Sequence, residues 1–244
     1  MNGIDVSHHQ GIIYWDTVAK SGMEFAIIKA GGSDSGFYKD SKFESNYEGA
    51  KKAGLKVGAY YYVGKNCTTR YAGISDANRF IEIIKGKQFE MPVFIDLEST
   101  PVSAKAGATE AVISFCETME AAGYYVGIYA SDISGFKDRL NIDKLTKWCK
   151  WVARYGSQPK YVEDYGIWQK SETGRVNGIS GNVDLDICYV DYSAVIENAG
   201  KNGYQKPVEN AAQPIAEPVK DTVKVTLEIR GKQYSGILEA IESE

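Results

Sequence analysis

Short runs of hydrophobic residues alternate with longer amphipathic stretches through most of the chain before Gly203. Several of the runs are apolar at consecutive positions, which is typical of β-strands that are buried on both faces. Runs of this kind predict eight strands, over residues 3–6, 25–30, 57–63, 92–97, 125–130, 151–155, 166–169 and 184–189.

Three amphipathic stretches between these runs predict helices, over residues 42–53, 72–84 and 109–122. Gly54 and Gly123 directly follow two of them, at the position where glycine commonly ends a helix. The repeated strand–helix order predicts a parallel sheet with covering helices, and eight strands favour a closed barrel. Because the last three strands lie close together in the sequence, helices do not fit between all of them. We therefore expect an α/β fold, an irregular TIM-like β/α barrel with fewer helices than strands.

The composition changes after Gly203, where Pro207, Pro214 and Pro218 fall in a stretch rich in Ala, Glu and Gln. Such a proline-rich stretch is typical of a linker. We expect three parts, a barrel domain over residues 1–200, a linker over 201–221 and a small appendage over 222–244.

The appendage has the pattern of a β-hairpin. Residues 222–229 alternate apolar and polar, residues 230–232 can turn, and residues 233–238 can return as a second strand. A lone hairpin is only marginally stable in water. We therefore expect this one to pack on the barrel or to pair with another copy of the chain.

The composition is that of an ordinary globular protein, with 43% hydrophobic and 25% charged residues and a net charge of −4. This mild acidity gives no general attraction to nucleic acid or to anionic membranes. No apolar run approaches the roughly 18 residues of a membrane helix. The first residues, Met1 to Asp5, have neither a basic nor an apolar leader region, so we expect no signal peptide.

Neither the cysteines nor the histidines suggest a metal site, and we expect no cofactor. Cys67, Cys116, Cys149 and Cys188 form no C-x-x-C pair and have no histidine at zinc-finger spacing. Buried free thiols are expected, with a disulfide as the alternative. His8 and His9 are the only histidines, and adjacent residues on a strand cannot both face one ion. Hydrogen bonding within their loop is the expected role.

The apolar run Val93 to Ile95 leads into two acids, Asp96 and Glu98, which are separated by one leucine. Residues i and i+2 of a strand share a face, and barrel active sites form at the carboxyl ends of the strands. Two nearby carboxylates repel each other, so one of them shifts toward its protonated form. A neutral acid beside an ionised one is the pair that cleavage of a glycosidic bond requires. The alternative is a solvated strand end without chemistry.

Further acids lie on the first and last predicted strands. Asp5 ends the first strand, and Asp184 and Asp186 lie on the last one. Because the first and last strands of a barrel are neighbours, Asp5 is expected to meet Asp184 or Asp186 across the closing seam. Those two aspartates share a face, so spacing does not choose between them. The alternative role for Asp5 is to cap the following turn.

Tyrosine and tryptophan are abundant, with 17 Tyr and 4 Trp against 8 Phe. Their flat apolar faces and polar tips suit a sugar-binding cleft. Tyr62 and Tyr129 are candidates for lining such a cleft, since they lie at strand ends, as do Tyr60, Tyr155 and Trp168. Core packing is the alternative for each of them.

Seven short motifs together resemble one known family. They are GIDVSHHQG at 3–11, FAIIKA at 25–30, GAYYY at 58–62, PVFIDLE at 92–98, GIYA at 127–130, GIWQ at 166–169 and GNVDLDIC at 181–188. In this order they resemble the glycoside hydrolase family 25 lysozymes, the Chalaropsis type of N-acetylmuramidase. The resemblance extends roughly over residues 1–197 and does not reach the tail.

The resemblance implies hydrolysis of the β-1,4 bond between N-acetylmuramic acid (MurNAc) and N-acetylglucosamine (GlcNAc) in bacterial peptidoglycan. It implies that Glu98 is the proton donor and that Asp96 assists, either by steering the N-acetyl group or as a base. Asp5 and Asp184 are implied as supporting carboxylates, with Asp184 rather than Asp186 at the family position. We expect substrate contacts from a further set of strand-end residues, Tyr60, Tyr62, Tyr129, Trp168 and Gln169.

Several alternatives stay open within this hypothesis. Substrate-assisted retention is favoured over inversion because the sugar carries the necessary acetamide. A non-catalytic barrel that binds glycans and a hydrolase of chitin-like chains are the other functions. A phage endolysin, made in the host cytoplasm and released through a holin, is expected, and a bacterial or prophage enzyme fits equally. The hairpin would bind wall polymer or pair between chains as a homo-oligomer.

Overall fold

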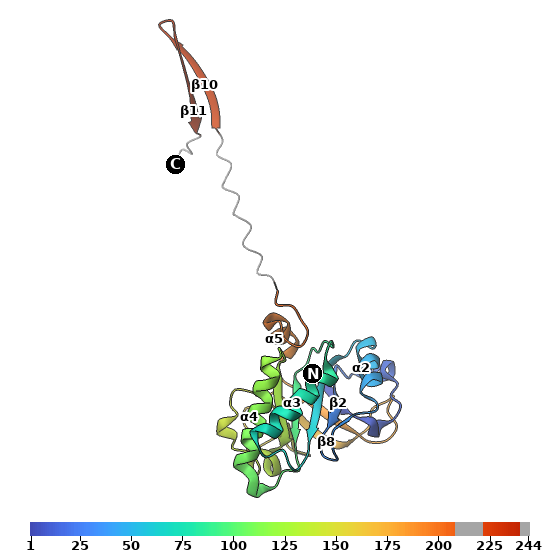
Figure 1. Ribbon diagram of the computed structural model, residues 1–244. Helices are drawn as coiled ribbons and strands as arrows, with labels where there is room; N and C mark the ends of the chain where they lie inside the picture. The colour runs from blue at the N-terminus through green and yellow to red at the C-terminus, as the bar shows by residue number, and fades with distance from the viewer. Residues whose placement is uncertain (208–221, 240–244) are drawn as a thin grey trace. The chain divides into compact units, whose positions relative to one another are not determined.

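The computed structural model describes residues 1–207 and 222–239 and divides the chain into two compact units (Figure 1). The first unit runs from Met1 to Lys206 and the second from Pro207 to Glu244, and each is described by itself. Most of the expected linker lies outside the described residues. Within the described parts, no helix is long and apolar enough to cross a membrane.

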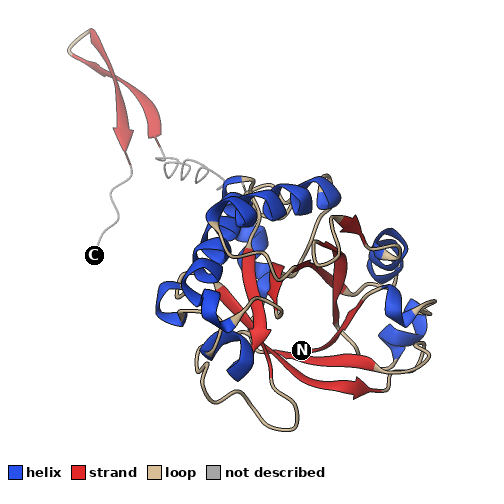
Figure 2. Ribbon diagram, turned by 60° about the horizontal axis from the view of Figure 1, so that its bottom comes forward, coloured by secondary structure: helices blue, strands red, loops and turns tan. Residues whose placement is uncertain are grey.

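The first unit is a closed barrel of eight strands, which confirms the expected architecture (Figure 2). The ring closes because β1 pairs with β2 on one side and with β9 on the other. A two-residue strand, β3 (Tyr38–Lys39), extends the sheet beside β2. The barrel strands are β1 (Asn2–Val6), β2 (Phe25–Gly32), β4 (Lys56–Val63), β5 (Val93–Leu97), β6 (Val126–Ser131), β7 (Cys149–Ala153), β8 (Ile167–Gly174) and β9 (Val183–Cys188).

One expectation about the sheet was wrong, because the barrel is mixed rather than wholly parallel. Strand β9 runs antiparallel to both of its neighbours, β8 and β1. The connection from β8 to β9 covers only residues 175–182 and contains no helix. A parallel crossover requires a dozen or more residues, so this short connection returns the chain in the opposite direction.

The three predicted helices are present as α2 (Phe43–Lys52), α3 (Arg70–Ile84) and α4 (Lys105–Ala121). The sequence pattern missed α1 (Trp15–Lys20) and α5 (Tyr192–Ala199) because six to eight residues contain too few turns to show a helical period. It also missed the short helical turns in the loops, which are Asp132–Lys137, with a π-helical pattern, and the 3₁₀ turns His8–Gln10, Val102–Ala104 and Ile142–Lys144.

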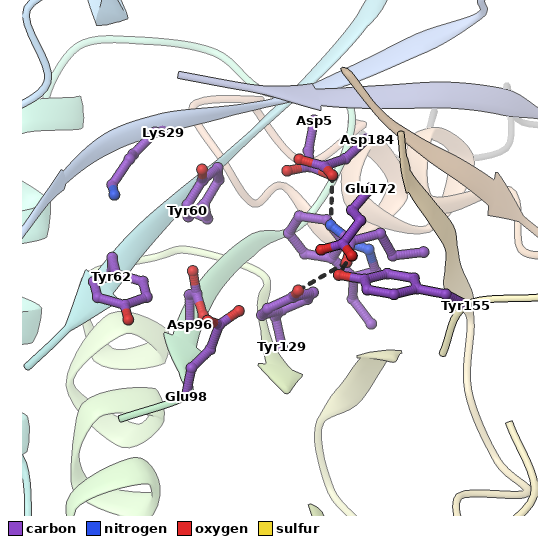
Figure 3. Close-up of a pocket in the computed structure, with 12 residues that line it drawn as sticks. Asp5, Lys29, Tyr60, Tyr62, Asp96, Glu98, Tyr129, Tyr155, Glu172 and Asp184 are labelled. Carbon is purple, nitrogen blue, oxygen red and sulfur yellow. Dashed lines mark hydrogen bonds between the residues drawn. The ribbon is translucent and has the colours of Figure 1, made fainter. Parts of the chain in front are cut away.

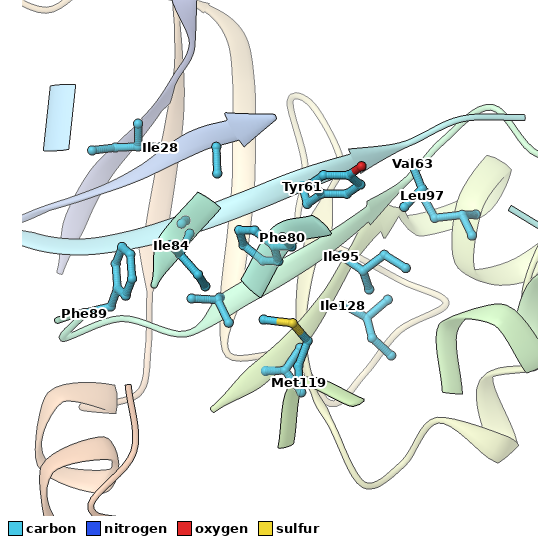
Figure 4. Close-up of a cluster of buried hydrophobic side chains, with 14 of the residues drawn as sticks. Ile28, Tyr61, Val63, Phe80, Ile84, Phe89, Ile95, Leu97, Met119 and Ile128 are labelled. Carbon is cyan, nitrogen blue, oxygen red and sulfur yellow. The ribbon is translucent and has the colours of Figure 1, made fainter. Parts of the chain in front are cut away.

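Helices α3 and α4 cover the outer face of the sheet and enclose an apolar core (Figure 4). Tyr61 of β4 points outward into this core, where its ring lies 5.7 Å from that of Phe80 and 6.4 Å from that of Phe115. Gly73 lets the two helices approach closely, since a Cβ there would lie 2.1 Å from the carbonyl oxygen of Ala111. The alternation of β4 therefore leaves Tyr60 and Tyr62 facing the barrel interior.

A second apolar cluster fills the barrel interior beneath its open mouth. Phe25, Ile27, Phe94 and Trp151 form its centre, and all four are almost fully buried. The rings of Phe94 and Trp151 are 5.3 Å apart in an edge-to-face arrangement. This packing lies beneath the open space at the end of the barrel where the parallel strands finish.

The chain continues to pack on the barrel after α5. Asn202 is fully buried, donates a hydrogen bond from Nδ2 to the carbonyl of Met91 at 3.0 Å, and accepts one from the Tyr125 backbone at 2.7 Å. The Tyr204 hydroxyl donates to Glu90 at 2.7 Å. These contacts explain why the first compact unit extends to Lys206 rather than ending at residue 200.

The described part of the second unit is the predicted hairpin, which is confirmed. Strands β10 (Thr222–Ile229) and β11 (Lys232–Glu239) pair antiparallel along their whole length. Arg230 and Gly231 make the turn with φ values of 52° and 74°. Positive φ at both central positions is the type I′ geometry that matches the twist of a hairpin.

Candidate active site

A cavity of about 260 Å³ opens at the mouth of the barrel, where the parallel strands end (Figure 3). All eight barrel strands contribute a side chain to its wall, and Glu98 joins them from just beyond the end of β5. The cavity is lined by Asp5, Lys29, Tyr60, Tyr62, Asp96, Glu98, Tyr129, Trp151, Tyr155, Gln169, Glu172 and Asp184.

The two acids of the D-x-E motif lie at different depths in this cavity. Asp96, on β5, is buried, and its Oδ1 has no hydrogen-bond partner among the described residues. Glu98 follows the strand end and is exposed to the cavity. Tyr62 on β4 and Tyr129 on β6 lie beside Asp96 in register, so aromatic rings flank the acid pair on both sides. A buried acceptor without a donor is a group that a bound ligand can satisfy.

The closing seam of the barrel brings further acids to the same mouth. Asp5 on β1 and Asp184 on β9 are directly paired, and both line the cavity. Asp186 lies deeper, is 1% exposed, and accepts a hydrogen bond from Trp151 Nε1 at 2.8 Å. Both aspartates of the last strand therefore meet the first strand, and Asp184 is the one that lines the cavity.

A chain of hydrogen bonds connects the aromatic wall with the seam. The hydroxyls of Tyr129 and Tyr155 donate to Gln169 Oε1 at 2.8 and 3.3 Å, and Gln169 Nε2 donates to Asp5 at 2.8 Å (Figure 3). Gln169 is 3% exposed, so little of its amide is accessible to solvent. These hydrogen bonds fix the orientation of the Gln169 amide and hold the Asp5 carboxyl group in place.

Burial dominates the electrostatics of the acids. It raises the pKa of Asp5 and Asp96 well above the usual range, and the neighbouring acids Asp186 and Glu98, respectively, add to the shifts. Burial also raises the pKa of Asp184 to about 6. The pKa of Glu98 is raised by burial as well, although Tyr129, Lys29 and Arg139 oppose this shift. Several of these carboxyl groups therefore hold protons at a pH where exposed carboxyls are ionised.

Eight of the nine expected site residues line the cavity, and Trp168 is the exception. Its indole Nε1 instead donates to the Arg154 carbonyl at 2.7 Å. Trp168 and Gln169 are adjacent on β8, so only one of them can face inward, and that residue is Gln169.

The sequence reasoning did not select Lys29, Trp151 or Glu172, which also line the cavity. Lys29 is the one cationic group in the cavity wall, and its Nζ lies 4.6 Å from the centre of the Tyr62 ring. A lysine within the apolar run FAIIKA was the available signal, because a charge on a buried strand requires a polar environment.

The histidines and cysteines play no part in this cavity. His8 Nδ1 lies 2.7 Å from Asp40 Oδ2, so its ring bonds to a residue just after β3 and not within its own loop as expected. All four cysteines are free. Within residues 1–207 and 222–239, no group of three or more His, Cys, Asp or Glu side chains is arranged to hold a metal ion.

Comparisons with known proteins show which proteins this chain is similar to. Residues 4–179 match the family described as Glycosyl hydrolases family 25. The chain is 35% identical to the autolytic lysozyme of Clostridium acetobutylicum over 76% of this chain and 55% of that protein. It is 31% identical to lysozyme M1 of Streptomyces globisporus over 75% and 66%, respectively. The chain thus spans between about half and two thirds of the length of these relatives.

Solved structures show the same fold. The CTP1L endolysin superposes with a TM-score of 0.70 at 26% identity, over 81% of this chain and 69% of that one. The bacterial lysozyme from Streptomyces coelicolor superposes with a TM-score of 0.66 at 29% identity, over 82% and 96%.

Replacing Asp186 by Asn is expected to change how stability depends on pH. Burial raises the pKa of Asp186 from 3.8 to about 8. Below pH 4 the carboxyl is protonated in the folded and unfolded states alike. Between pH 4 and pH 8 the unfolded chain releases a proton that the folded chain keeps, so the wild type loses up to about 1.4 kcal/mol of stability per pH unit. Asn cannot ionise, so D186N escapes this loss. The melting temperature of D186N minus that of wild type should therefore increase as the pH rises from 4 to 8.

Thermal melts at several pH values check this expectation. The control is D143N, which removes a carboxyl group that is exposed and has no side-chain hydrogen bond within the described residues. Its melting temperature should differ from that of wild type by a constant amount between pH 4 and pH 8. Parallel curves for D186N and wild type would show that Asp186 has an ordinary pKa.

Proposed function

Since the chain belongs to glycosyl hydrolase family 25, we propose that it is a lysozyme of the muramidase type, which hydrolyses the β-1,4 bond between MurNAc and GlcNAc in bacterial peptidoglycan. The observation that carries the proposal is the convergence of Asp5, Asp96, Glu98 and Asp184 on one cavity with aromatic walls. The lysozyme and endolysin names of the relatives support the same activity. The substrate would be the glycan strand of the cell wall.

Glu98 is proposed as the general acid. It stands just beyond β5 and faces the open part of the cavity, where a glycosidic oxygen can reach it. Burial raises the pKa of Glu98, which favours the protonated form that a general acid must have. After the first step the ionised Glu98 would take a proton from the attacking water.

Asp96 is proposed to position the acetamido group of the sugar. Its buried Oδ1 has no donor among the described residues, and an acetamido N–H would supply one. The acetamido oxygen could then attack the anomeric carbon while Glu98 protonates the leaving group. This is substrate-assisted retention, and it needs no carboxylate nucleophile. Inversion would instead require a carboxylate to activate water across a gap of roughly 6.5–9.5 Å between the two carboxyls.

Asp5 and Asp184 are proposed to support this chemistry from the opposite wall. Asp5 is held by the Gln169 amide, and Asp184 is its direct partner across the seam. Tyr60, Tyr62 and Tyr129 would offer ring faces and hydroxyls to the sugar. An endolysin released from the host cell to reach the wall is the proposed biological setting, supported by the likeness to the CTP1L endolysin.

The hairpin is proposed to pair with a second copy of the chain. Val223, Leu227 and Ile229 lie on one face of β10 and are 63%, 58% and 55% exposed, and Tyr234 extends that face from β11. An isolated hairpin is marginal in water, so burying this face against an identical one would stabilise both copies. Binding of wall polymer is the other proposed use of the hairpin.

Digestion of purified peptidoglycan should release fragments with MurNAc at the new reducing ends. Mass spectrometry after borohydride reduction identifies the terminal sugar, and NMR during digestion gives its initial configuration. Retention predicts that the β anomer appears first. GlcNAc ends would contradict the muramidase proposal, whereas an initial α anomer would contradict only the retaining mechanism.

Replacing Glu98 by Gln should lower kcat by about 10²–10⁴-fold, because the amide keeps the shape of the side chain but cannot donate the acid proton. Clearing of a wall suspension and release of reducing ends measure the loss. The control is E163Q, an exposed substitution outside the cavity, which should leave the rate unchanged. Equal rates for E98Q and wild type would reject the acid assignment, and a wild type that binds walls without cleaving them would indicate a glycan-binding barrel.

Removing the residues after Lys206 should convert a dimer into a monomer while leaving the fold of the compact first unit intact. Light scattering after size exclusion gives the mass in solution. In the full chain, L227K should act like the truncation because it places a charge on the apolar face. T226K, on the opposite face, should not. A monomeric full chain whose truncation loses wall binding would instead assign the hairpin to wall polymer.

A further inference from the structure

A second cavity, of about 310 Å³, lies next to the acid cluster and shares three wall residues with it. The shared residues are Glu98, Tyr129 and Tyr155, so the two cavities meet at the proposed general acid. The rest of the second wall includes Arg139 and Arg154, whereas Lys29 is the one cation in the first. A ligand that reaches Glu98 can therefore extend into a basic compartment.

The two guanidinium groups are held in place by the loops around them. Arg139 donates from Nε to the Thr100 carbonyl at 2.8 Å and from Nη1 to the Ser134 carbonyl. Arg154 donates from Nη1 to Asp132 at 2.7 Å. In each arginine, Nη2 has no hydrogen-bond partner among the described residues. Both side chains thus keep donors for a ligand in a preorganised position.

The two cavities differ in their titratable groups. Five carboxyl groups and one lysine line the first, while Glu98 is the one acid in the wall of the second. Asp132 offsets the charge of Arg154, but Arg139 forms no ion pair among the described residues. A carboxylate on a substrate would meet Lys29 as the one cation in the first cavity, whereas Arg139 and Arg154 would attract it in the second.

We propose that the cavity beside Arg139 and Arg154 binds a carboxylate on the muramic acid side of the substrate. This inference rests on the proposed muramidase function and adds a site to it. Muramic acid carries a lactyl group that ends in a carboxyl, and the stem peptide attached there has carboxylates of its own. GlcNAc carries none. A carboxylate site beside the general acid would therefore orient the glycan strand, with Arg139 as a specificity-determining residue.

Three forms of one glycan substrate test the site and distinguish the two carboxylate sources. The first carries stem peptides, the second is stripped of stems so that its lactyl carboxylates are free, and the third has those carboxylates coupled to methylamine and is neutral. R139Q should raise KM about tenfold or more on at least one charged form and leave KM on the neutral form nearly unchanged. A loss on the stem-bearing form alone assigns the stem carboxylate, and a loss on the stripped form assigns the lactyl group.

The neutral strand also separates this site from effects on Glu98. Burial raises the pKa of Glu98, and Arg139 opposes this rise. R139Q should therefore shift the pH profile on all three substrates alike. A local folding defect would likewise reduce all three rates equally. R139K, which keeps the charge, should recover part of the discrimination between charged and neutral strands. R70Q is the matched control, because Arg70 pairs with Glu110 and Glu117 of α4 and lines neither cavity.

Equal losses on charged and neutral strands, or no loss on any of them, would overturn the carboxylate site. If wild type cleaves none of the three strands, the muramidase proposal itself fails. If wild type and R139Q cleave all three with the same preference, only the carboxylate site fails.

Discussion

Five carboxyl groups line a cavity in which Lys29 is the one cationic side chain, and the chemistry of the site depends on the free energy of holding them there. Ionised carboxylates lose hydration on burial and repel each other, so the site lowers its energy by keeping protons. This is why the pKa values of Asp5, Asp96 and Glu98 are all raised. Burial, with the repulsion between these acids, therefore favours the protonated form that acid catalysis requires.

Closure of the barrel is what creates the crowding. Strand β9 runs back between β8 and β1, and this places Asp184 opposite Asp5 and Asp186 opposite Gln169. The same closure lets Gln169 bridge the tyrosine hydroxyls and Asp5. An open sheet would leave the first and last strands far apart, and neither the seam nor the hydrogen-bond chain would exist.

Because side chains alternate along the strands, the outer face of the barrel wall packs in the core and the inner face lines the cavity. On β4, Tyr61 packs against Phe80 and Phe115 in the core, whereas Tyr60 and Tyr62 face the cavity. Stability therefore comes mainly from the outer layer and from the apolar cluster that fills the barrel interior beneath the mouth. The inner positions above that cluster carry polar and aromatic side chains. Glu98 stands where the first and the second cavity meet.

The sequence by itself determined the features that depend on neighbouring residues. Eight apolar runs in a repeated strand–helix order indicated a barrel, the spacing of Asp96 and Glu98 placed both on one face, and the alternation after Thr222 predicted the hairpin. The last two follow from the period of two along a strand, which a single segment contains in full.

The tertiary structure alone decided what depends on segments far apart in the chain. The direction of β9, the inward position of Gln169 in place of Trp168, and the presence of Lys29 among the acids belong to this class. Local patterns specify that a strand has two faces but not which face turns inward, because packing against distant strands decides that. Desolvation is likewise a property of the whole barrel, so the raised pKa values of the acids could not be read from any segment of the sequence.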